Sequence, residues 1–401
     1  MAATIPEPQQ MAHTTQLPGE RIAGRQLATG VSLLYLALYF HFGFFAWMPV
    51  WLKDAGSSAT EIGTLISIPL ILRILTVAPF AAWCGRHGRV RNGIALTVFS
   101  AAVVLVFFPQ ATTHWSRLAL FLVFSIIWDQ IPVLMDAYAI LTVRSRKLDF
   151  GRLRVWGSIA VIASSGLAGW VIEKLGIKSL PWAIAVLLLF PLAILPLLPR
   201  DSTLVHESSH GSGSWREIFR DRTLMSVLIT ASLLMGSSGV ITGFGSIQWK
   251  SAGIHESTIG ILNAISVSSE IVIFTFGAKL LGKRDPRIMM VIGALFSALR
   301  WAIMATSPAL PMLVFAQILQ CFLVAGALLA PVLMIASRVE DILVPSAQGL
   351  YAVLLGATLA AVIAGSGWLW QLGPAKAYLA MAVLALLSLP VLASSWRRAA
   401  A

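Results

Sequence analysis

Residues 128–158 read WDQIPVLMDAYAILTVRSRKLDFGRLRVWGS, and this stretch decides what kind of protein the chain forms. It predicts an apolar helix that carries Asp129 and Asp136, followed by a short basic connection and a second apolar segment that opens at Trp156. A helix has about 3.6 residues per turn, so the spacing of the two aspartates places both carboxylates on one face. Both apolar segments are long enough to cross a bilayer. We therefore expect the two carboxylates at membrane depth, where an ionisable group marks a candidate functional site.

The composition around this stretch is that of a membrane protein. Of the 401 residues, 58% are hydrophobic and only 11% are charged, whereas a soluble domain carries about 25% charged residues. The net charge of +12 does not predict nucleic-acid binding, because the basic residues stand in short loops between apolar runs and not on one polar face. The charge instead follows the rule that the cytoplasmic loops of membrane proteins are rich in Lys and Arg.

The sequence does not contain the motifs that would indicate an enzyme or a metalloprotein. Cys84 and Cys321 lie far apart in the sequence and suggest neither a disulfide framework nor a metal site. No Gly-rich phosphate loop, HExxH motif or nucleophile elbow occurs. His206 and His210 stand in a Ser/Gly-rich stretch that is typical of a flexible linker. We expect no catalytic residues, no metal and no cofactor.

Hydropathy divides the chain into apolar runs that can span a bilayer, which needs about 20 mainly apolar residues. Twelve such runs are expected, at residues 27–52, 58–82, 93–110, 116–142, 154–173, 180–198, 223–249, 257–280, 287–306, 311–336, 346–370 and 375–395. The first run ends without a small-residue cleavage site, so it is predicted to be a retained helix and not a signal peptide. The resulting layout is a polar tail at 1–26, a six-helix bundle at 27–199, a linker at 200–222 and a second six-helix bundle at 223–401.

Lys and Arg are distributed unevenly over the predicted loops. Most of the 29 basic residues fall in the segments on one side, which include the tail, the basic connection after Asp136 and the linker. Because such segments face the cytoplasm, we expect a multi-pass protein of the cytoplasmic (inner) membrane with both termini in the cytoplasm.

An internal repeat relates the two predicted bundles. Residues 51–63 read WLKDAGSSATEIG and residues 248–260 read QWKSAGIHESTIG, at an offset of 197 residues. The same offset pairs Arg73 with Glu270. If a pseudo-twofold axis along the membrane normal relates the bundles, a base and an acid occupy equivalent places in them. Parallel repeats of this kind build the two halves of major facilitator transporters.

The six-plus-six pattern with a central linker resembles the major facilitator superfamily, whose fold is all-α and integral to the membrane. Residues 85–91, GRHGRVR, are similar to a degraded form of that superfamily's loop 2–3 signature, with Gly85 where an acidic residue is usual. Residues 148–158, LDFGRLRVWGS, are similar to the proton-linked permeases related to lactose permease, and especially to the 3-phenylpropionate permease branch. Further likeness to that branch extends over residues 44–56, 243–253, 268–280 and 298–305.

The resemblance implies a substrate-binding pair. In the lactose permease family an acid on helix 4 and an Arg at the start of helix 5 bind the substrate, and Asp136 and Arg154 stand at the matching positions. A carboxylate and a guanidinium can hold a polar substrate through charge-assisted hydrogen bonds. The alternative is that the pair latches a cytoplasmic gate and never touches substrate.

The resemblance also implies residues that couple transport to protons. Helices 8 and 9 of the family supply a Glu and an Arg for coupling, which match Glu270 and Arg300. The His and Glu that lactose permease uses on helix 10 correspond here to Gln320 and Leu323, and neither ionises near neutral pH. The expected proton carriers are therefore carboxylates: Glu270, Asp136 and Asp129. A static ion pair of Glu270 with an arginine, and a helix-packing role for Asp129, are the alternatives.

Two arginines within the spans, Arg73 and Arg300, suit an organic anion. An aromatic acid would need a flat apolar wall besides a guanidinium. The candidates for that wall are aromatic residues of the spans: Tyr35, Tyr39, Trp128, Tyr138, Trp156 and Trp301. Helix packing or an interfacial belt is the alternative for each of them. The candidate substrate-binding set is therefore Asp136, Arg154, Arg73, Arg300, Trp156 and Tyr39.

Together these patterns predict a monomeric secondary transporter that works by alternating access, with a central site between two six-helix bundles. The expected function is proton-coupled import, that is symport, of a small organic acid and in particular an aromatic acid. Proton-coupled uptake of a sugar or a nucleoside is the alternative that the match at Asp136 and Arg154 favours. A sensor or scaffold that uses the same fold without transport is an alternative of another class. The expected partners are the small-molecule substrate, protons and the lipid bilayer, but no nucleic acid.

Overall fold

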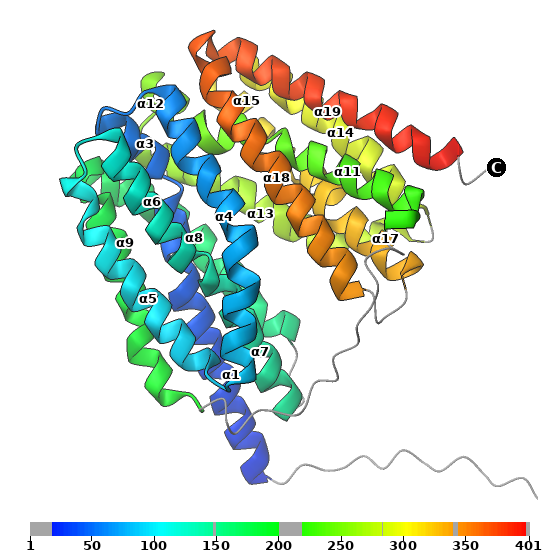
Figure 1. Cartoon of the computed structure of the whole chain (residues 1–401). Helices are drawn as coiled ribbons and strands as arrows, with labels where there is room; N and C mark the ends of the chain where they lie inside the picture. Colours follow the sequence, from blue (N-terminus) through cyan, green and yellow to red (C-terminus); the bar gives the residue numbers. More distant parts are fainter. Residues whose placement is uncertain (1–17, 147–149, 200–218, 283, 340–343, 398–401) are drawn as a thin grey trace, which may run out of the picture.

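The computed structural model describes helices and connecting turns, with no strand in the ranges that it covers (Figure 1): 18–146, 150–199, 219–282, 284–339 and 344–397. Eleven of the described helical segments are long and apolar enough to cross a membrane. One further candidate is the pair Ala59–Arg73 and Leu75–Arg86, which is bent by 41°. Pro69 and Pro79 lie inside this bent helix, and each removes a backbone hydrogen bond. Counting the pair as one span gives the twelve that the sequence predicts.

The N-terminal half forms one group of helices, drawn from blue to green on the left of Figure 1. Its helices are α1 (Pro18–Tyr39), α2 (His41–Phe45), α3 (Met48–Asp54), α4 (Ala59–Arg86), α5 (Val90–Val106), α6 (His114–Trp128), α7 (Gln130–Arg146), α8 (Phe150–Leu175) and α9 (Leu180–Ile194). The first expected span is thus divided among α1, α2 and α3, and the fourth between α6 and α7.

The C-terminal half forms the second group, most of which lies on the right of Figure 1. It contains α11 (Arg222–Gly236), a π-helical turn (Ile241–Gly245), α12 (Ser246–Ser251), α13 (Glu256–Leu281), α14 (Arg287–Ala305), α15 (Leu310–Ile318), α16 (Gln320–Val324), a second π-helical turn (Ala325–Leu329), α17 (Ala330–Arg338), α18 (Val344–Gln371) and α19 (Pro374–Arg397). The seventh and tenth expected spans are the broken ones here, and they correspond to the broken first and fourth spans of the other half. Broken helices and π-helical turns are common at binding sites.

The break between α6 and α7 follows from the local sequence. Asp129 ends the hydrogen-bonded run of α6, with its backbone N–H donating to the Ser125 carbonyl at 3.0 Å. Pro132 has no N–H, so it cannot donate to the carbonyl of Trp128 four residues earlier. The helix is therefore interrupted at Asp129, within the span His114–Thr142.

The repeat in the sequence has a counterpart in the backbone. Gly56 and Gly253, which the 197-residue offset relates, both adopt left-handed conformations, with φ of 86° and 79°. Glycine adopts this region without the clash that a Cβ would cause. Each of these glycines lies two residues after a short helix, α3 in one half and α12 in the other, and just before the long helix that follows.

The two halves meet through two crossings of long helices, α4 with α18 and α8 with α13. At the first crossing, a Cβ added to Gly63 or Gly367 would lie 3.0 or 2.6 Å from a carbonyl oxygen of the facing helix. At the second, a Cβ added to Gly169 or Gly260 would lie 2.2 or 2.4 Å from one. Glycines therefore let the backbones touch at both crossings. We call this the closed end of the bundle.

Away from the closed end the helices of the two halves spread apart, as the lower part of Figure 1 shows. We call this the open end. It holds the C-terminal end of α4, at Arg86, and the start of α8, at Phe150. Leu75 of α4 and Phe274 of α13 are exposed in this part of the bundle.

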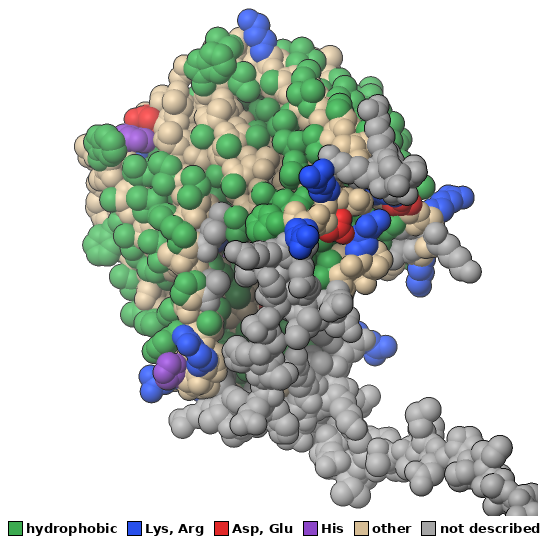
Figure 2. Space-filling model, turned by 45° about the vertical axis from the view of Figure 1, so that its right-hand side comes forward, with side chains coloured by type: hydrophobic (Ala, Val, Ile, Leu, Met, Phe, Trp, Pro, Cys, Tyr) green, Lys and Arg blue, Asp and Glu red, His purple; other side chains and the backbone are tan. Residues whose placement is uncertain are grey.

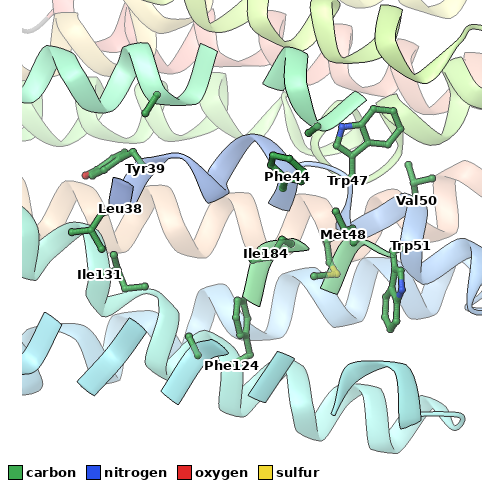
Figure 3. Close-up of a cluster of buried hydrophobic side chains, with 14 of the residues drawn as sticks. Leu38, Tyr39, Phe44, Trp47, Met48, Val50, Trp51, Phe124, Ile131 and Ile184 are labelled. Carbon is green, nitrogen blue, oxygen red and sulfur yellow. The ribbon is translucent and has the colours of Figure 1, made fainter. Parts of the chain in front are cut away.

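The core of the N-terminal half is a set of large apolar side chains that point between its helices (Figure 3). Trp47, Leu38, Phe124 and Ile184 come from four separate segments and are fully buried. Hydrophobic side chains are also spread over the face shown in Figure 2, where Lys and Arg side chains are few and lie mainly on the right at mid-height and at the lower left. An apolar flank of this kind is what a bilayer requires.

Several expected boundaries shift or fall outside the described residues. α1 begins at Pro18, within the segment expected to be a polar tail, and α4 extends to Arg86. Residues 1–17 of the expected tail and 200–218 of the expected linker, with His206 and His210, lie outside the described residues. The division into tail, linker and two bundles at the predicted boundaries stays a prediction.

Candidate functional site

An ion pair in the N-terminal half joins α7 to α8. Arg154 Nε lies 3.3 Å from Asp136 Oδ1, and Tyr35 of α1 donates its hydroxyl hydrogen to the same oxygen at 2.7 Å. The side chains of Asp136 and Arg154 are 36% and 38% exposed, so a solute can reach both. The two residues that the family resemblance pairs are thus in contact, and Tyr35 adds a third hydrogen-bonding group.

The guanidinium of Arg154 also lies over aromatic rings. Its Cζ is 4.6 Å from the centroid of the Tyr39 ring and 5.8 Å from that of Tyr35. Gly157, one turn further along α8, makes this possible, because a Cβ there would lie 3.1 Å from Arg154 Nη1 and 3.2 Å from the Tyr39 ring. The Tyr39 hydroxyl is buried without a hydrogen-bond partner in the described part of the chain. This cluster therefore offers a cation on a flat apolar surface, beside an unused hydroxyl.

Two more predicted residues lie near this cluster. Asp129, at the break between α6 and α7, is only 6% exposed. Arg73 of α4 is close enough to interact electrostatically with both Asp129 and Tyr39. Arg73 itself is exposed, and its charge acts on groups in the interior of the N-terminal half. The charge of Arg73 therefore acts both on Asp129 and on the cluster of Asp136, Arg154 and Tyr39.

The C-terminal half holds its charges in a chain of side-chain hydrogen bonds. Arg300 of α14 is 1% exposed and donates to the side-chain oxygens of Gln317, at 3.0 Å, and of Gln320. The Gln320 amide nitrogen in turn donates to Glu270 Oε1 of α13 at 2.9 Å. Arg300 and Glu270 are therefore linked through an amide and not through a direct ion pair.

One aromatic ring lies against the buried guanidinium, and a second packs on the first. Arg300 Cζ lies 4.6 Å from the centroid of the Trp301 indole, whose N–H donates to Ser237 of α11 at 3.0 Å. The Tyr378 ring stacks on Trp301 at 6.3 Å. Arg300 Nε remains without a partner among the described residues. Both halves thus place an arginine against an aromatic ring, one half-exposed and one buried.

The predicted substrate-binding residues fall into two clusters, one in each half. Asp136, Arg154 and Tyr39 are in contact, and Arg73 is near them. Arg300 lies in the other cluster, and no hydrogen bond or ion pair between described residues joins the two. Trp156 is 42% exposed, and no side-chain hydrogen bond or ring interaction between described residues links it to either cluster.

The glutamines are the members of the C-terminal cluster that sequence reasoning did not predict. Gln320 stood out only as a neutral residue at a position where the family has an ionisable one, and Gln317 was not singled out. Their spacing of three residues on a predicted apolar helix was the available signal, since residues at i and i+3 share a face. Which helix that face contacts could not be read from the chain.

A cavity of about 150 Å³ lies beside Asp129. Its walls come mainly from α2, α3, α4 and α6, and Thr242 of the first π-helical turn closes it from the C-terminal half. The cavity therefore lies where the two halves face each other. Leu65 and Ile66 of its wall follow Gly63 of the closed end by one turn or less on α4.

Comparison with known proteins identifies the family. A family model described as "MFS_1 like family" matches residues 29–380. The chain belongs to this family. The MFS_1-like chain is 29% identical over 363 residues to the "Probable 3-phenylpropionic acid transporter" of Escherichia coli (strain K12), which covers 89% of this chain and 94% of that protein. It is 24% identical over 288 residues to "Maltose permease" of Geobacillus stearothermophilus, which covers 69% and 71% of the two chains.

A solved structure agrees with this assignment at the level of the fold. The crystal structure of the nucleoside transporter NupG matches the MFS_1-like chain with a TM-score of 0.76 at 16% identity, over 92% of this chain and 98% of that one. The predicted major facilitator fold is therefore confirmed. Since the family and its relatives are transporters, the chain is a multi-pass membrane transporter of a small molecule, and the expectation that it is no enzyme is confirmed.

Proposed function

We propose that this transporter imports a small organic acid with an aromatic ring, together with protons, across the cytoplasmic membrane. The observation that carries the proposal is the half-exposed Arg154 guanidinium, which lies against Tyr39 and has Asp136 as its ion-pair partner. A carboxylate that enters can take over hydrogen bonds of the guanidinium. The name of the Escherichia coli relative, a probable 3-phenylpropionic acid transporter, supports this substrate class.

Residues of both clusters take part in substrate binding under this proposal. Arg154 and Arg73 attract the carboxylate, and Tyr39 supplies a flat surface. Asp136 holds Arg154 in place until the substrate arrives. As the two halves close around the substrate, Arg300 contacts it from the C-terminal half. Trp156 contacts it from the open end.

Transport follows from movement of the two halves about the central site. The closed end, held by the glycine crossings, faces the outside, and the open end faces the cytoplasm with both termini. Rocking the halves opens the glycine crossings and brings the open end together. Because the interface is between halves of one chain, the transporter works as a monomer.

Protons are carried by carboxylates of the interior in this scheme. Glu270 is the first candidate, because it accepts a hydrogen bond from a neutral amide, Gln320, and no cation among the described residues pairs with it directly. Asp136 and Asp129 are the further candidates. A protonated Glu270 can still accept the hydrogen bond from Gln320 at its carbonyl oxygen, so this hydrogen bond can form in both protonation states.

Uptake into proteoliposomes tests the proposal. Labelled 3-phenylpropionate should accumulate when the outer solution is more acidic than the lumen, and unlabelled aromatic acids should compete while sugars and nucleosides should not. Empty liposomes and the Arg154→Met variant are the controls. Competition by sugars or nucleosides alone, with none from aromatic acids, would overturn the proposed substrate class.

Uptake of a sugar or a nucleoside is the second candidate. The hydrogen bond of Tyr35 to the Asp136–Arg154 pair favours it, since such a polar group also suits hydroxyls. A maltose permease is among the relatives. Flux of none of these solutes in either direction would instead favour a sensor or scaffold.

A further inference from the structure

The cavity beside Asp129 has the size and the walls of a site for one aromatic ring. Its volume is about 150 Å³, and an apolar protein cavity of about 150 Å³ holds a benzene molecule. Phe45 and Trp128 both line it, with ring centroids 4.4 Å apart and planes at 28°. The indole N–H of Trp128 donates to the buried His41 at 2.5 Å, which fixes the orientation of the wall.

One wall of this apolar cavity carries a charge. Asp129 lines the cavity and is 6% exposed, yet no described residue donates a hydrogen bond to its carboxylate. A buried carboxylate without a donor is costly. Ser125 is also in the lining, but its hydroxyl makes no hydrogen bond to the Asp129 carboxylate; the two residues are joined only through their backbones. The carboxylate is therefore available to accept a hydrogen bond from whatever fills the cavity.

The helix that forms another wall also determines where an anionic group would lie. Pro69 and Leu70 of α4 line the cavity, and Arg73 follows them by four and three residues. Residues at these spacings lie on one face of a helix, about 5.4 Å further along its axis. A ligand with its ring in the cavity would thus place a carboxylate, two or three bonds from the ring, near the guanidinium of Arg73.

We infer that the cavity between α3, α4 and α6 binds the ring of the transported acid, and that Asp129 selects rings that carry a hydroxyl group. The hydroxyl donates to the Asp129 carboxylate, and the acid group of the same molecule lies toward Arg73. The inference rests on the proposed function and narrows its substrate class to hydroxyaryl acids. An ammonium group would also donate to Asp129, but the nearby positive charge of Arg73 disfavours a cation.

Binding of matched acids to the full-length protein in lipid nanodiscs tests the inference. The ligands are 3-phenylpropionate and its 3- and 4-hydroxyphenyl analogues, measured by calorimetry. A hydrogen bond to a charged group contributes about 1.5–3 kcal/mol, so one hydroxylated acid should bind roughly 10- to 100-fold more tightly than the parent acid. In Asp129→Leu the ratio of the two affinities should fall to about one.

The outcomes separate this inference from the proposed function. Equal binding of hydroxylated and parent acids by the wild type, or a preference that survives in Asp129→Leu, overturns the inference and leaves the proposed function standing. Binding of none of the acids overturns both. If Asp129 only carries protons, its substitution changes all affinities by a similar factor and the ratio stays, which also overturns the inference.

A second variant keeps the test valid if Asp129→Leu fails to fold. Ala46 lines the cavity and is exposed, so Ala46→Phe places a ring in the cavity without disturbing buried packing. It should weaken binding of all three acids at least tenfold. The matched control is Ala119→Phe, at an exposed position of α6 that does not line the cavity, and it should bind them as the wild type does. Unweakened binding by Ala46→Phe overturns the inference.

Discussion

The two halves of this transporter hold an arginine against an aromatic ring in different ways. In the N-terminal half, Arg154 pairs directly with Asp136, and both side chains are more than a third exposed. In the C-terminal half, Arg300 is 1% exposed, and the Gln320 amide separates it from Glu270. An exposed pair can exchange one partner for a ligand at little cost, whereas a buried cation depends on every partner that it has. We therefore propose two roles for the two halves, with binding in the N-terminal half and coupling in the C-terminal half.

The largest expected effect comes from removing the buried cation. Arg300→Met leaves the side-chain oxygens of Gln317 and Gln320 without their donor, and removing one partner of a buried charged cluster costs about 3–5 kcal/mol. Chemical denaturation in detergent should detect a loss of this size. Arg154→Met is the matched control, with an expected loss of at most about 1 kcal/mol because the pair is exposed. Equal losses in the two variants would contradict the comparison between the halves.

The second effect concerns binding in the N-terminal half. Arg154→Met removes a charged hydrogen-bond donor worth about 1.5–3 kcal/mol to an anionic ligand, so the affinity for an organic acid should fall roughly 10- to 100-fold. Calorimetry on the purified protein measures it. Arg154→Lys keeps the charge but not the planar guanidinium that stacks on Tyr39. Its affinity for the acid should therefore lie between those of the wild type and Arg154→Met. Unchanged affinity in both variants would mean that Asp136 and Arg154 hold a cytoplasmic gate closed and do not bind the substrate.

A smaller effect separates the two tyrosines that surround Arg154. Tyr35→Phe removes the hydrogen bond to Asp136, which is 2.7 Å long, and should cost about 0.5–1.5 kcal/mol of stability. Tyr39→Phe is the control, because the Tyr39 hydroxyl has no partner among the described residues, so its removal should cost nothing. The difference between the two melting temperatures is the measurement. A larger loss in Tyr39→Phe would mean that the Tyr39 hydroxyl is bonded after all.

The sequence predicted the features of the N-terminal cluster better than those of the C-terminal one. Asp136 and Arg154 carry charge within apolar spans, and charge at membrane depth is visible without a structure. Gln317 and Gln320 are neutral amides, and nothing in an apolar helix indicates that an amide faces an arginine of another helix. The Glu270 link through Gln320 therefore became apparent only when α13, α14 and α16 were placed together.

The fold was predictable where a single segment determines it, and less so where segments meet. Apolar runs gave the spans, and the repeat related Gly63 to Gly260 before their contacts were known. The partners of these glycines, Gly367 and Gly169, depend on which helices cross, which hydropathy does not reveal. The cavity beside Asp129 has walls from several helices and from Thr242 of the other half. Such a site has no pattern in the linear sequence.

The smallest effect on stability is expected at Glu270, together with a selective effect on coupling. Glu270→Gln keeps a side-chain oxygen that accepts the hydrogen bond from Gln320, so the free energy of unfolding should change by less than about 1 kcal/mol. Uptake by the wild type should rise as the outer pH falls, because a proton must reach the carboxylate before the halves move. Uptake by Glu270→Gln should lose this dependence, since an amide does not titrate.

The same two measurements distinguish a proton carrier from a structural charge at Glu270. A static role would give wild-type uptake that is independent of the outer pH, together with a clear loss of stability in Glu270→Gln. Asp136→Asn is the comparison in the other half, where the neutral amide weakens the attraction to Arg154 and lowers the affinity for the acid. If Asp136→Asn removed the pH dependence and Glu270→Gln kept it, coupling would belong to the exposed pair, and the division of roles between the halves would be reversed.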